Sequence, residues 1–143
     1  MEKQFKKYFL GANSCEGFVA HFADCYSPES GWHAYIIKGG PGTGKSSFMK
    51  YMVSRAEECG FSPELCICSS DPQSLDGIII GELKVVFLDG TAPHIVEPRL
   101  PGVCESIINL GAFWDEKKLI AKFNTHLHVL NYFWLIPHIK QLG

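Results

Sequence analysis

The chain has 143 residues, of which 46% are hydrophobic and 20% are charged, and its formal net charge is −2. These values are typical of an ordinary globular protein, and the length fits one domain, residues 1–143, with a buried core. The slight negative charge gives no electrostatic reason to expect a nucleic-acid partner.

Cysteine spacing and hydropathy argue against three further classes, namely zinc-binding, secreted and membrane-spanning proteins. None of the six cysteines forms a Cys-x-x-Cys pair, so the sequence gives no sign of a zinc site. The lysines near the start are not followed by the apolar segment of a signal peptide. The most apolar run, residues 127–137, is far shorter than the roughly 20 residues that a membrane span needs. We expect a soluble, cytoplasmic protein with no membrane partner.

The most informative stretch is residues 34–47, Ala-Tyr-Ile-Ile-Lys-Gly-Gly-Pro-Gly-Thr-Gly-Lys-Ser-Ser. It contains a glycine, four residues and then Gly-Lys-Ser, which is the phosphate-loop pattern. The pattern requires a buried strand before it and a helix after it. Residues 34–38 predict that strand, and apolar residues at amphipathic spacing predict a helix over residues 45–59, with Gly60 as its cap.

The residue types in this loop suit phosphate binding. Glycines allow a tight turn around a phosphate, and backbone N–H groups at a helix N-terminus hold the anion. Lys45 would reach the β- and γ-phosphates, and the Ser46 hydroxyl would complete a Mg²⁺ shell. The predicted nucleotide-binding residues are Gly39, Gly40, Pro41, Gly42, Thr43, Gly44, Lys45, Ser46 and Ser47.

A second strand is predicted over residues 64–68, followed by a polar loop over residues 69–77. Open α/β sheets bind ligands at the carboxyl ends of their strands, which makes Asp71 and Asp76 candidates for a general base or for holding a water on Mg²⁺. Asp-Pro and Asp-Gly are also ordinary turn formers. For Asp71 both roles stay open, and for Asp76 we favour the turn.

A third strand is predicted over residues 83–88, and it delivers Asp89 to the edge of the sheet. Apolar residues followed by aspartate form a Walker B pattern, in which the carboxylate reaches the Mg²⁺ beside the phosphate loop. Asp89 and Ser46 are therefore the predicted metal ligands, and Lys45, Asp89 and Asp71 the catalytic candidates. His94 and Arg99 could also contact phosphates, but a surface position is favoured for both.

Two helices complete the prediction. Residues 103–110 look like a short helix, and Asp115 can cap a longer one that ends at Pro137. The apolar side chains of the longer helix recur at steps of three and four, so we expect that face to pack on the sheet.

Four segments in this order resemble a poorly characterised bacterial family of P-loop proteins described as ATPases. They are residues 38–47, 68–77, 89–94 and 109–114, read as KGGPGTGKSS, CSSDPQSLDG, DGTAPH and NLGAFW. The resemblance covers residues 8–120 and implies a P-loop NTPase fold that binds ATP through Gly39–Ser47. It supplies no substrate.

Family members are longer, and the tail over residues 124–143 is more aromatic than the charged helix expected there. We therefore expect an α/β, three-layer, parallel-sheet domain of the P-loop type that is incomplete, with three recognisable strands where about five are usual. Lid or finger residues from a later segment would be missing.

The expected function is ATP binding with Mg²⁺ and hydrolysis of the nucleotide. One alternative is a small-molecule kinase in which Asp71 deprotonates the acceptor. The other is a catalytically idle nucleotide-binding fragment that associates through its aromatic tail. Guanine specificity is not expected, because the chain lacks an Asn-Lys-x-Asp segment.

Overall fold

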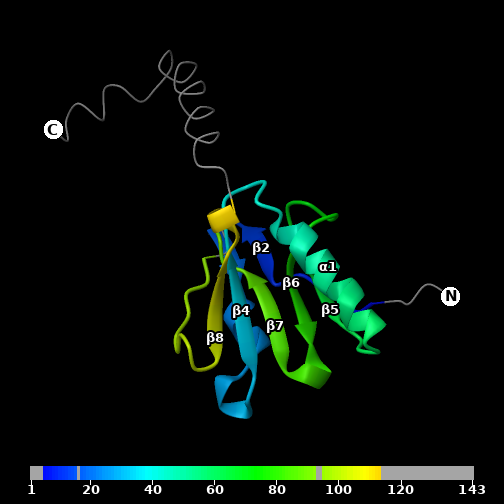
Figure 1. Ribbon diagram of the computed structural model, residues 1–143. Helices are drawn as coiled ribbons and strands as arrows, with labels where there is room; N and C mark the ends of the chain where they lie inside the picture. The colour runs from blue at the N-terminus through cyan, green and yellow to red at the C-terminus, as the bar shows by residue number, and fades with distance from the viewer. Residues whose placement is uncertain (1–4, 16, 93–94, 114–143) are drawn as a thin grey trace. The chain divides into compact units, whose positions relative to one another are not determined.

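The computed structural model describes residues 5–15, 17–92 and 95–113 of the chain. By compactness the chain divides into residues 1–111 and 112–143, and the fold below is that of the first unit. Its strands and its one described α-helix are shown in Figure 1. In chain order the elements are β1 (Lys7–Tyr8), β2 (Gly11–Ser14), β3 (Gly17–Ala20), β4 (His33–Lys38), α1 (Lys45–Glu58), β5 (Glu64–Ile67), β6 (Leu75–Ile80), β7 (Val85–Asp89) and β8 (Glu105–Asn109).

A six-stranded sheet in the order β1-β5-β6-β7-β4-β8 forms the framework, and β2 and β3 form a separate antiparallel hairpin. Strand β4 pairs in parallel with β7 and β8, and β1 pairs in parallel with β5. Strand β6 runs antiparallel to both of its neighbours, β5 and β7. The sheet is therefore mixed and mostly parallel, where a parallel sheet was expected, and it has six strands where the sequence allowed three to be recognised.

The three predicted strands are all present, with shifted ends. Residues 34–38 lie in β4 and residues 64–67 in β5, as expected. The third strand starts at Val85 rather than at residue 83, because Gly81–Leu83 form a 3₁₀ turn. Lys84 ends that turn with a φ of 53°, and a left-handed residue cannot continue an extended strand.

Strand β6 falls where the sequence predicted part of a loop, over residues 69–77. Asp76 and Gly77 looked like a turn, yet both are buried in the strand. A Cβ on Gly77 would lie 2.9 Å from the Phe87 carbonyl oxygen, so the glycine allows close strand packing instead of a turn. The short 3₁₀ connection to β7 explains the antiparallel direction, because parallel neighbours need a long crossover.

The predicted helix over residues 103–110 is also wrong. Glu105–Asn109 form β8, the edge strand beside β4, and a 3₁₀ turn follows at Leu110–Phe113. Ile107 and Ile108 are β-branched and suit a strand, and pairing with five residues of β4 supplies the hydrogen bonds that decide between the two structures.

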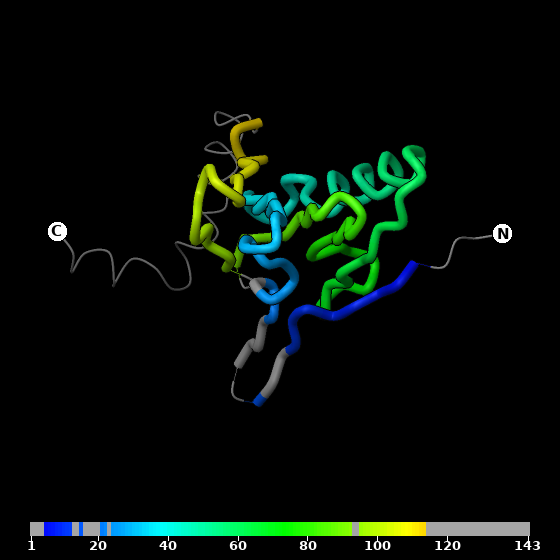
Figure 2. Tube along the Cα trace, turned by 90° about the horizontal axis from the view of Figure 1, so that it is seen from below, coloured from blue at the N-terminus to red at the C-terminus, as the bar shows by residue number. Residues whose placement is uncertain are grey.

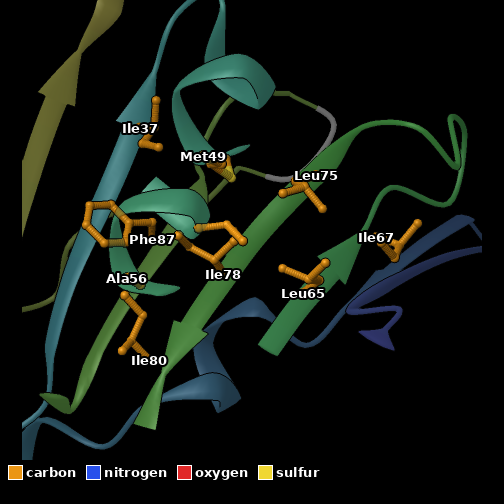
Figure 3. Packing of buried hydrophobic residues seen from close by; sticks show 10 residues of the cluster. Ile37, Met49, Ala56, Leu65, Ile67, Leu75, Ile78, Ile80 and Phe87 are labelled. Atoms are coloured by element: carbon orange, nitrogen blue, oxygen red, sulfur yellow. The ribbon is translucent and has the colours of Figure 1, made fainter. Parts of the chain in front are cut away.

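The predicted helix after the phosphate-loop sequence is confirmed as α1, which covers one face of the sheet. Met49, Val53 and Ala56 on its inner face pack against side chains of β4, β5, β6 and β7, as Figure 3 shows for Met49 and Ala56. The Gly60 N–H bonds to the Glu57 carbonyl, and the Phe61 N–H to that of Ala56, which is the Schellman form of helix end.

The opposite face of the sheet is covered by the N-terminal part of the chain, which Figure 2 shows on the other side of the sheet from α1. Phe22 and Tyr26 pack there against Ile36, Val86 and Leu88. Among the described residues this layer contains 3₁₀ turns but no α-helix, so the expected three-layer arrangement of helices is not found in this part of the chain. The predicted helix from Asp115 to Pro137 lies outside the described residues.

Candidate functional site

The phosphate-loop sequence lies between the carboxyl end of β4 and the first turn of α1. Gly44 is the N-cap of α1 with a φ of 88°, a left-handed conformation that suits glycine. At Gly39 a Cβ would lie 2.6 Å from Thr43 Oγ1, so a larger residue would displace the threonine and fill the loop. The first N–H groups of a helix lack intrahelical acceptors, which makes this end an anion-binding end.

Lys45 lies over this loop at the start of α1. Its Nζ donates to the carbonyl oxygens of Gly39, at 2.7 Å, and Gly40, at 3.2 Å. Asp89 Oδ2 lies 3.7 Å from the same Nζ, and both side chains are 13% exposed. The ammonium is thus held in the loop by neutral carbonyls and has a carboxylate nearby at the outer limit of an ion pair.

Asp89 reaches this position because β7 pairs in register with β4, so that Asp89 lies opposite Ile37. Its Oδ1 accepts a hydrogen bond from the Thr91 N–H at 2.9 Å, which orients the carboxylate. Asp89 therefore lies close to the phosphate loop, as predicted.

Thr91 connects the segment after β7 to the phosphate loop. Its hydroxyl donates to the Gly39 carbonyl at 3.0 Å and accepts from the Gly39 N–H at 3.2 Å. Lys38 adds to this connection, because its Nζ donates to the carbonyl oxygens of Gly90 and Val96, both at 2.8 Å. These contacts fix the start of the loop, and the sequence analysis did not predict them.

Ser46 connects the phosphate loop to β6. Its Oγ accepts a hydrogen bond from the Leu75 N–H at 3.0 Å, so the first residue of β6 is tied to the first turn of α1. The hydroxyl oxygen keeps a further lone pair, which leaves it able to meet a metal ion.

Asp71 has the hydrogen bonds of a turn residue. Its Oδ2 accepts from the Ser74 hydroxyl at 2.5 Å and its Oδ1 from the Gln73 N–H at 3.0 Å. The Ser74 hydrogen bond and then the Gln73 N–H lower the pKa of this exposed carboxyl. Of the two roles left open for Asp71, these contacts fit the turn, because a lowered pKa makes a weak base.

An open pocket of about 550 Å³ lies over this part of the sheet. Its size is within the usual range for small-molecule sites. It is lined by several of the predicted site residues, namely Pro41, Gly42, Gly44, Lys45, Ser46, Ser47, Asp71 and Asp89. Gly39, Gly40 and Thr43 are not among the lining residues, and the Thr43 hydroxyl donates to the Gly40 carbonyl at 2.8 Å.

Asp76 also lines the pocket, although the sequence analysis favoured a turn for it. It lies in β6 and is 5% exposed. The signal that could have found it is its place two residues before a run of three isoleucines, which predicts a buried strand, because an aspartate is rarely buried unless it has a partner.

Of the two weaker candidates, Arg99 does not join this site. Arg99 is not among the residues that line the pocket. It lies near the buried Glu105, with Nε 3.9 Å from Oε1, and over the ring of Tyr26. His94 lies outside the described residues.

A second cavity, of about 510 Å³, is lined by Phe5, Lys6, Pro63, Glu64 and Glu82 among others. Its charged groups are already engaged with one another or with backbone. Lys6 Nζ lies 3.2 Å from Glu64, and Glu82 accepts from the Ser62 N–H at 3.0 Å. It therefore offers less free charge to a ligand than the pocket over the phosphate loop.

The side-chain oxygen atoms near Lys45 that could bind a metal ion suit Mg²⁺ better than a soft metal. No group of three or more His, Cys, Asp or Glu residues placed to hold a metal occurs in the described part of the chain. Magnesium does not need such a group, because it binds through one or two carboxylates, waters and phosphates of a nucleotide. The Ser46 hydroxyl and the Asp89 carboxylate would be the protein ligands of the ion.

No model of a known protein family matches this sequence, and neither does any curated protein or solved structure. Among the described residues, no helix has both the length and the apolar composition of a membrane span.

Proposed function

We propose that this protein binds ATP with Mg²⁺ in the pocket between β4, β6, β7 and the start of α1, and hydrolyses it. The observation that carries the proposal is the position of Lys45. Its ammonium is held by two carbonyls of a glycine loop, at the N-terminus of a helix, with an aspartate 3.7 Å away.

This arrangement suits a polyphosphate for electrostatic reasons. The helix end carries a partial positive charge, and the ammonium adds a full one inside a pocket where fewer waters screen it. An anion there would gain hydrogen bonds from backbone N–H groups, since the closest partners of the Lys45 ammonium are neutral carbonyls and the Asp89 carboxylate lies at the outer limit of an ion pair.

The chain's own residues would bind and orient the nucleotide. Lys45 would contact the terminal phosphates, and Ser46 and Asp89 would hold the Mg²⁺, which supplies charge neutralisation when bound. Phosphoryl transfer depends mainly on positioning and electrostatics, so these groups suit hydrolysis. No contact among the described residues favours the kinase alternative, because the Asp71 carboxylate is engaged in a turn. The proposed association through residues 124–143 lies outside the described residues.

The test is a calorimetric titration of the purified chain with ATP and Mg²⁺, beside Lys45→Ala and Lys50→Ala. Lys50 is an exposed lysine of the same helix that does not line the pocket, so it controls for loss of one positive charge. We expect binding by the wild type and by Lys50→Ala, and none by Lys45→Ala.

Phosphate release from ATP separates the hydrolase from an idle binder. Free ATP at about 100 times its dissociation constant should also raise the free energy of unfolding by about 2.7 kcal/mol. Equal ATP affinity of the wild type and Lys45→Ala would contradict the proposed site, and binding without phosphate release would contradict hydrolysis.

A further inference from the structure

The Gly39 carbonyl oxygen accepts hydrogen bonds from two side chains. Lys45 Nζ donates to it at 2.7 Å and the Thr91 hydroxyl at 3.0 Å. A carbonyl oxygen has two lone pairs, so it can accept from both groups at once. The Thr91 oxygen also accepts the Gly39 N–H at 3.2 Å, and this one side chain therefore binds both main-chain polar groups of Gly39.

The Gly40 carbonyl oxygen has a similar arrangement. It accepts from Lys45 Nζ at 3.2 Å, from the Thr43 hydroxyl at 2.8 Å and from the Thr43 N–H at 3.3 Å. Each of the two carbonyls that hold the Lys45 ammonium is thus also bound by a threonine hydroxyl. The ammonium can leave both carbonyls without leaving either of them unbonded.

Thr91 keeps its position through contacts that do not involve Lys45. Its N–H donates to Asp89 Oδ1 at 2.9 Å, and the preceding Gly90 N–H donates to a carbonyl of β4 at 2.9 Å. A Cβ on Gly90 would collide with a side chain of β4, so the main chain before Thr91 lies directly against that strand. The hydroxyl would therefore stay on Gly39 when the lysine moves.

Binding of a polyphosphate would require such a move. Lys45 Nζ lies on the two carbonyls, whereas the proposed function needs it on the terminal phosphates of ATP. A half-buried carbonyl that loses its donor weakens binding, because a nucleotide in the pocket would keep water from replacing the donor. The Thr91 hydroxyl avoids this loss at Gly39, since it donates to the carbonyl whether or not the ammonium is there.

We propose that Thr91 is a positioning residue of the nucleotide site, whose hydroxyl keeps the Gly39 carbonyl bonded when Lys45 turns to the phosphates. The inference rests on the proposed function, because a bound anion is what would draw the ammonium away. Thr91 is not among the residues that line the pocket, so it acts through the loop and not on the nucleotide.

The first test needs no nucleotide and measures whether the two donors share the carbonyl. Urea unfolding compares the wild type, Thr91→Val, Lys45→Met and the double variant. Each single variant leaves the Gly39 carbonyl with one side-chain donor, and the double variant leaves it with neither. We expect the double variant to lower the folding equilibrium constant about fivefold or more beyond the product of the two single effects.

The second test measures ATP affinity with Mg²⁺ by calorimetry for the wild type, Thr91→Ser and Thr91→Val. Serine keeps the hydroxyl, so Thr91→Ser should bind ATP within about twofold of the wild type. Thr91→Val should bind about fivefold or more weakly, because the Gly39 carbonyl loses its last side-chain donor when Lys45 turns to the phosphates. A threonine that only stabilised the loop would affect the free energy of unfolding without changing the ATP affinity of the folded protein.

Ser54→Ala is the matched control. The Ser54 hydroxyl also donates to a main-chain carbonyl, that of Lys50 at 3.3 Å, but it lies on the exposed surface of α1 and does not line the pocket. Ser54→Ala should keep the ATP affinity of the wild type, and its effect on unfolding should add to that of Lys45→Met. If Thr91→Val does not fold, Thr91→Ala also lacks the hydroxyl and takes its place in both tests.

Two results would overturn this inference and leave the proposed function standing. Additive effects of Thr91→Val and Lys45→Met on unfolding would show that the two donors do not share the Gly39 carbonyl. Equal ATP affinity of Thr91→Ser and Thr91→Val would show that the hydroxyl is not needed when the nucleotide binds. Absence of ATP binding by the wild type would instead reject the proposed function and, with it, the role of Thr91 in binding.

Discussion

A half-buried carboxylate and a fully buried one lie at opposite ends of the sheet, and their surroundings differ. Asp89 ends β7 beside the phosphate loop, and Glu105 begins β8, where it pairs in register with Ala34 near the start of β4. The Glu105 side chain is fully buried, while that of Asp89 is 13% exposed at an open pocket.

Glu105 is surrounded by donors. Tyr26 donates its hydroxyl to Oε1, the Leu100 N–H donates to Oε2 at 2.7 Å, and Arg99 lies 3.9 Å away. Burial alone would raise the pKa of Glu105, but the hydrogen bonds from Tyr26 and Leu100 outweigh it and the pKa is lowered. Burial and then Glu105 raise the pKa of Tyr26 to about 12. This cluster holds residues 99–105 and Tyr26 together.

Asp89 has one backbone donor and a lysine at 3.7 Å, and it faces the pocket. The comparison shows that burial of a carboxylate does not by itself indicate a ligand site. What separates the two is how many protein donors already surround the group and whether a pocket adjoins it.

The largest expected effect is on stability, from Glu105→Ala. The substitution leaves the Tyr26 hydroxyl and the Leu100 N–H without their acceptor in a buried place, and should lower the free energy of unfolding by about 3 kcal/mol. Urea unfolding measures it, with Glu29→Ala as an exposed control. ATP affinity of the folded protein should not change. A loss below about 0.5 kcal/mol would show that the cluster does not stabilise the fold.

Asp89→Asn should show the opposite pattern. The amide keeps the Thr91 hydrogen bond at Oδ1, and Lys45 keeps its two carbonyl acceptors, so the free energy of unfolding should change by no more than about 1 kcal/mol. Affinity for ATP with Mg²⁺ should fall about tenfold or more, measured by calorimetry. A loss of stability with unchanged ATP affinity would show that Asp89, like Glu105, stabilises the fold and does not bind the ligand.

The smallest expected effect is the pH dependence that Glu105 gives to stability. Its pKa is lowered in the folded state from the ordinary value of 4.5, so the folded state binds fewer protons than the unfolded state in this range. The contribution is complete above pH 4.5 and is lost as pH falls through the lower, folded pKa. Glu105→Gln should remove this part of the dependence, seen in urea midpoints from pH 7 to pH 3. An unchanged pH profile in Glu105→Gln would contradict it.

Local sequence was sufficient for the part of the fold that surrounds the phosphate loop. Residues 34–38, the glycine loop, the helix from Lys45 and the cap at Gly60 were predicted and are present. The position of Asp89 beside Lys45 was predicted as well. These features depend on short-range properties, such as apolar spacing, glycine conformation and the order of strand, loop and helix, which a sequence displays directly.

Strands β6 and β8, and with them Asp76 and Glu105, were decided by the tertiary structure. Residues 75–77 were predicted as part of a loop and residues 105–109 as part of a helix, and they are strands because distant partners on β7, β5 and β4 supply their hydrogen bonds. The energy of strand pairing depends on residues far apart in the chain, so the local sequence does not reveal it as a periodic pattern. The sequence alone determined the phosphate loop. Only strand pairing placed Asp76 in the lining of the adjoining pocket and buried Glu105 at the opposite end of the sheet.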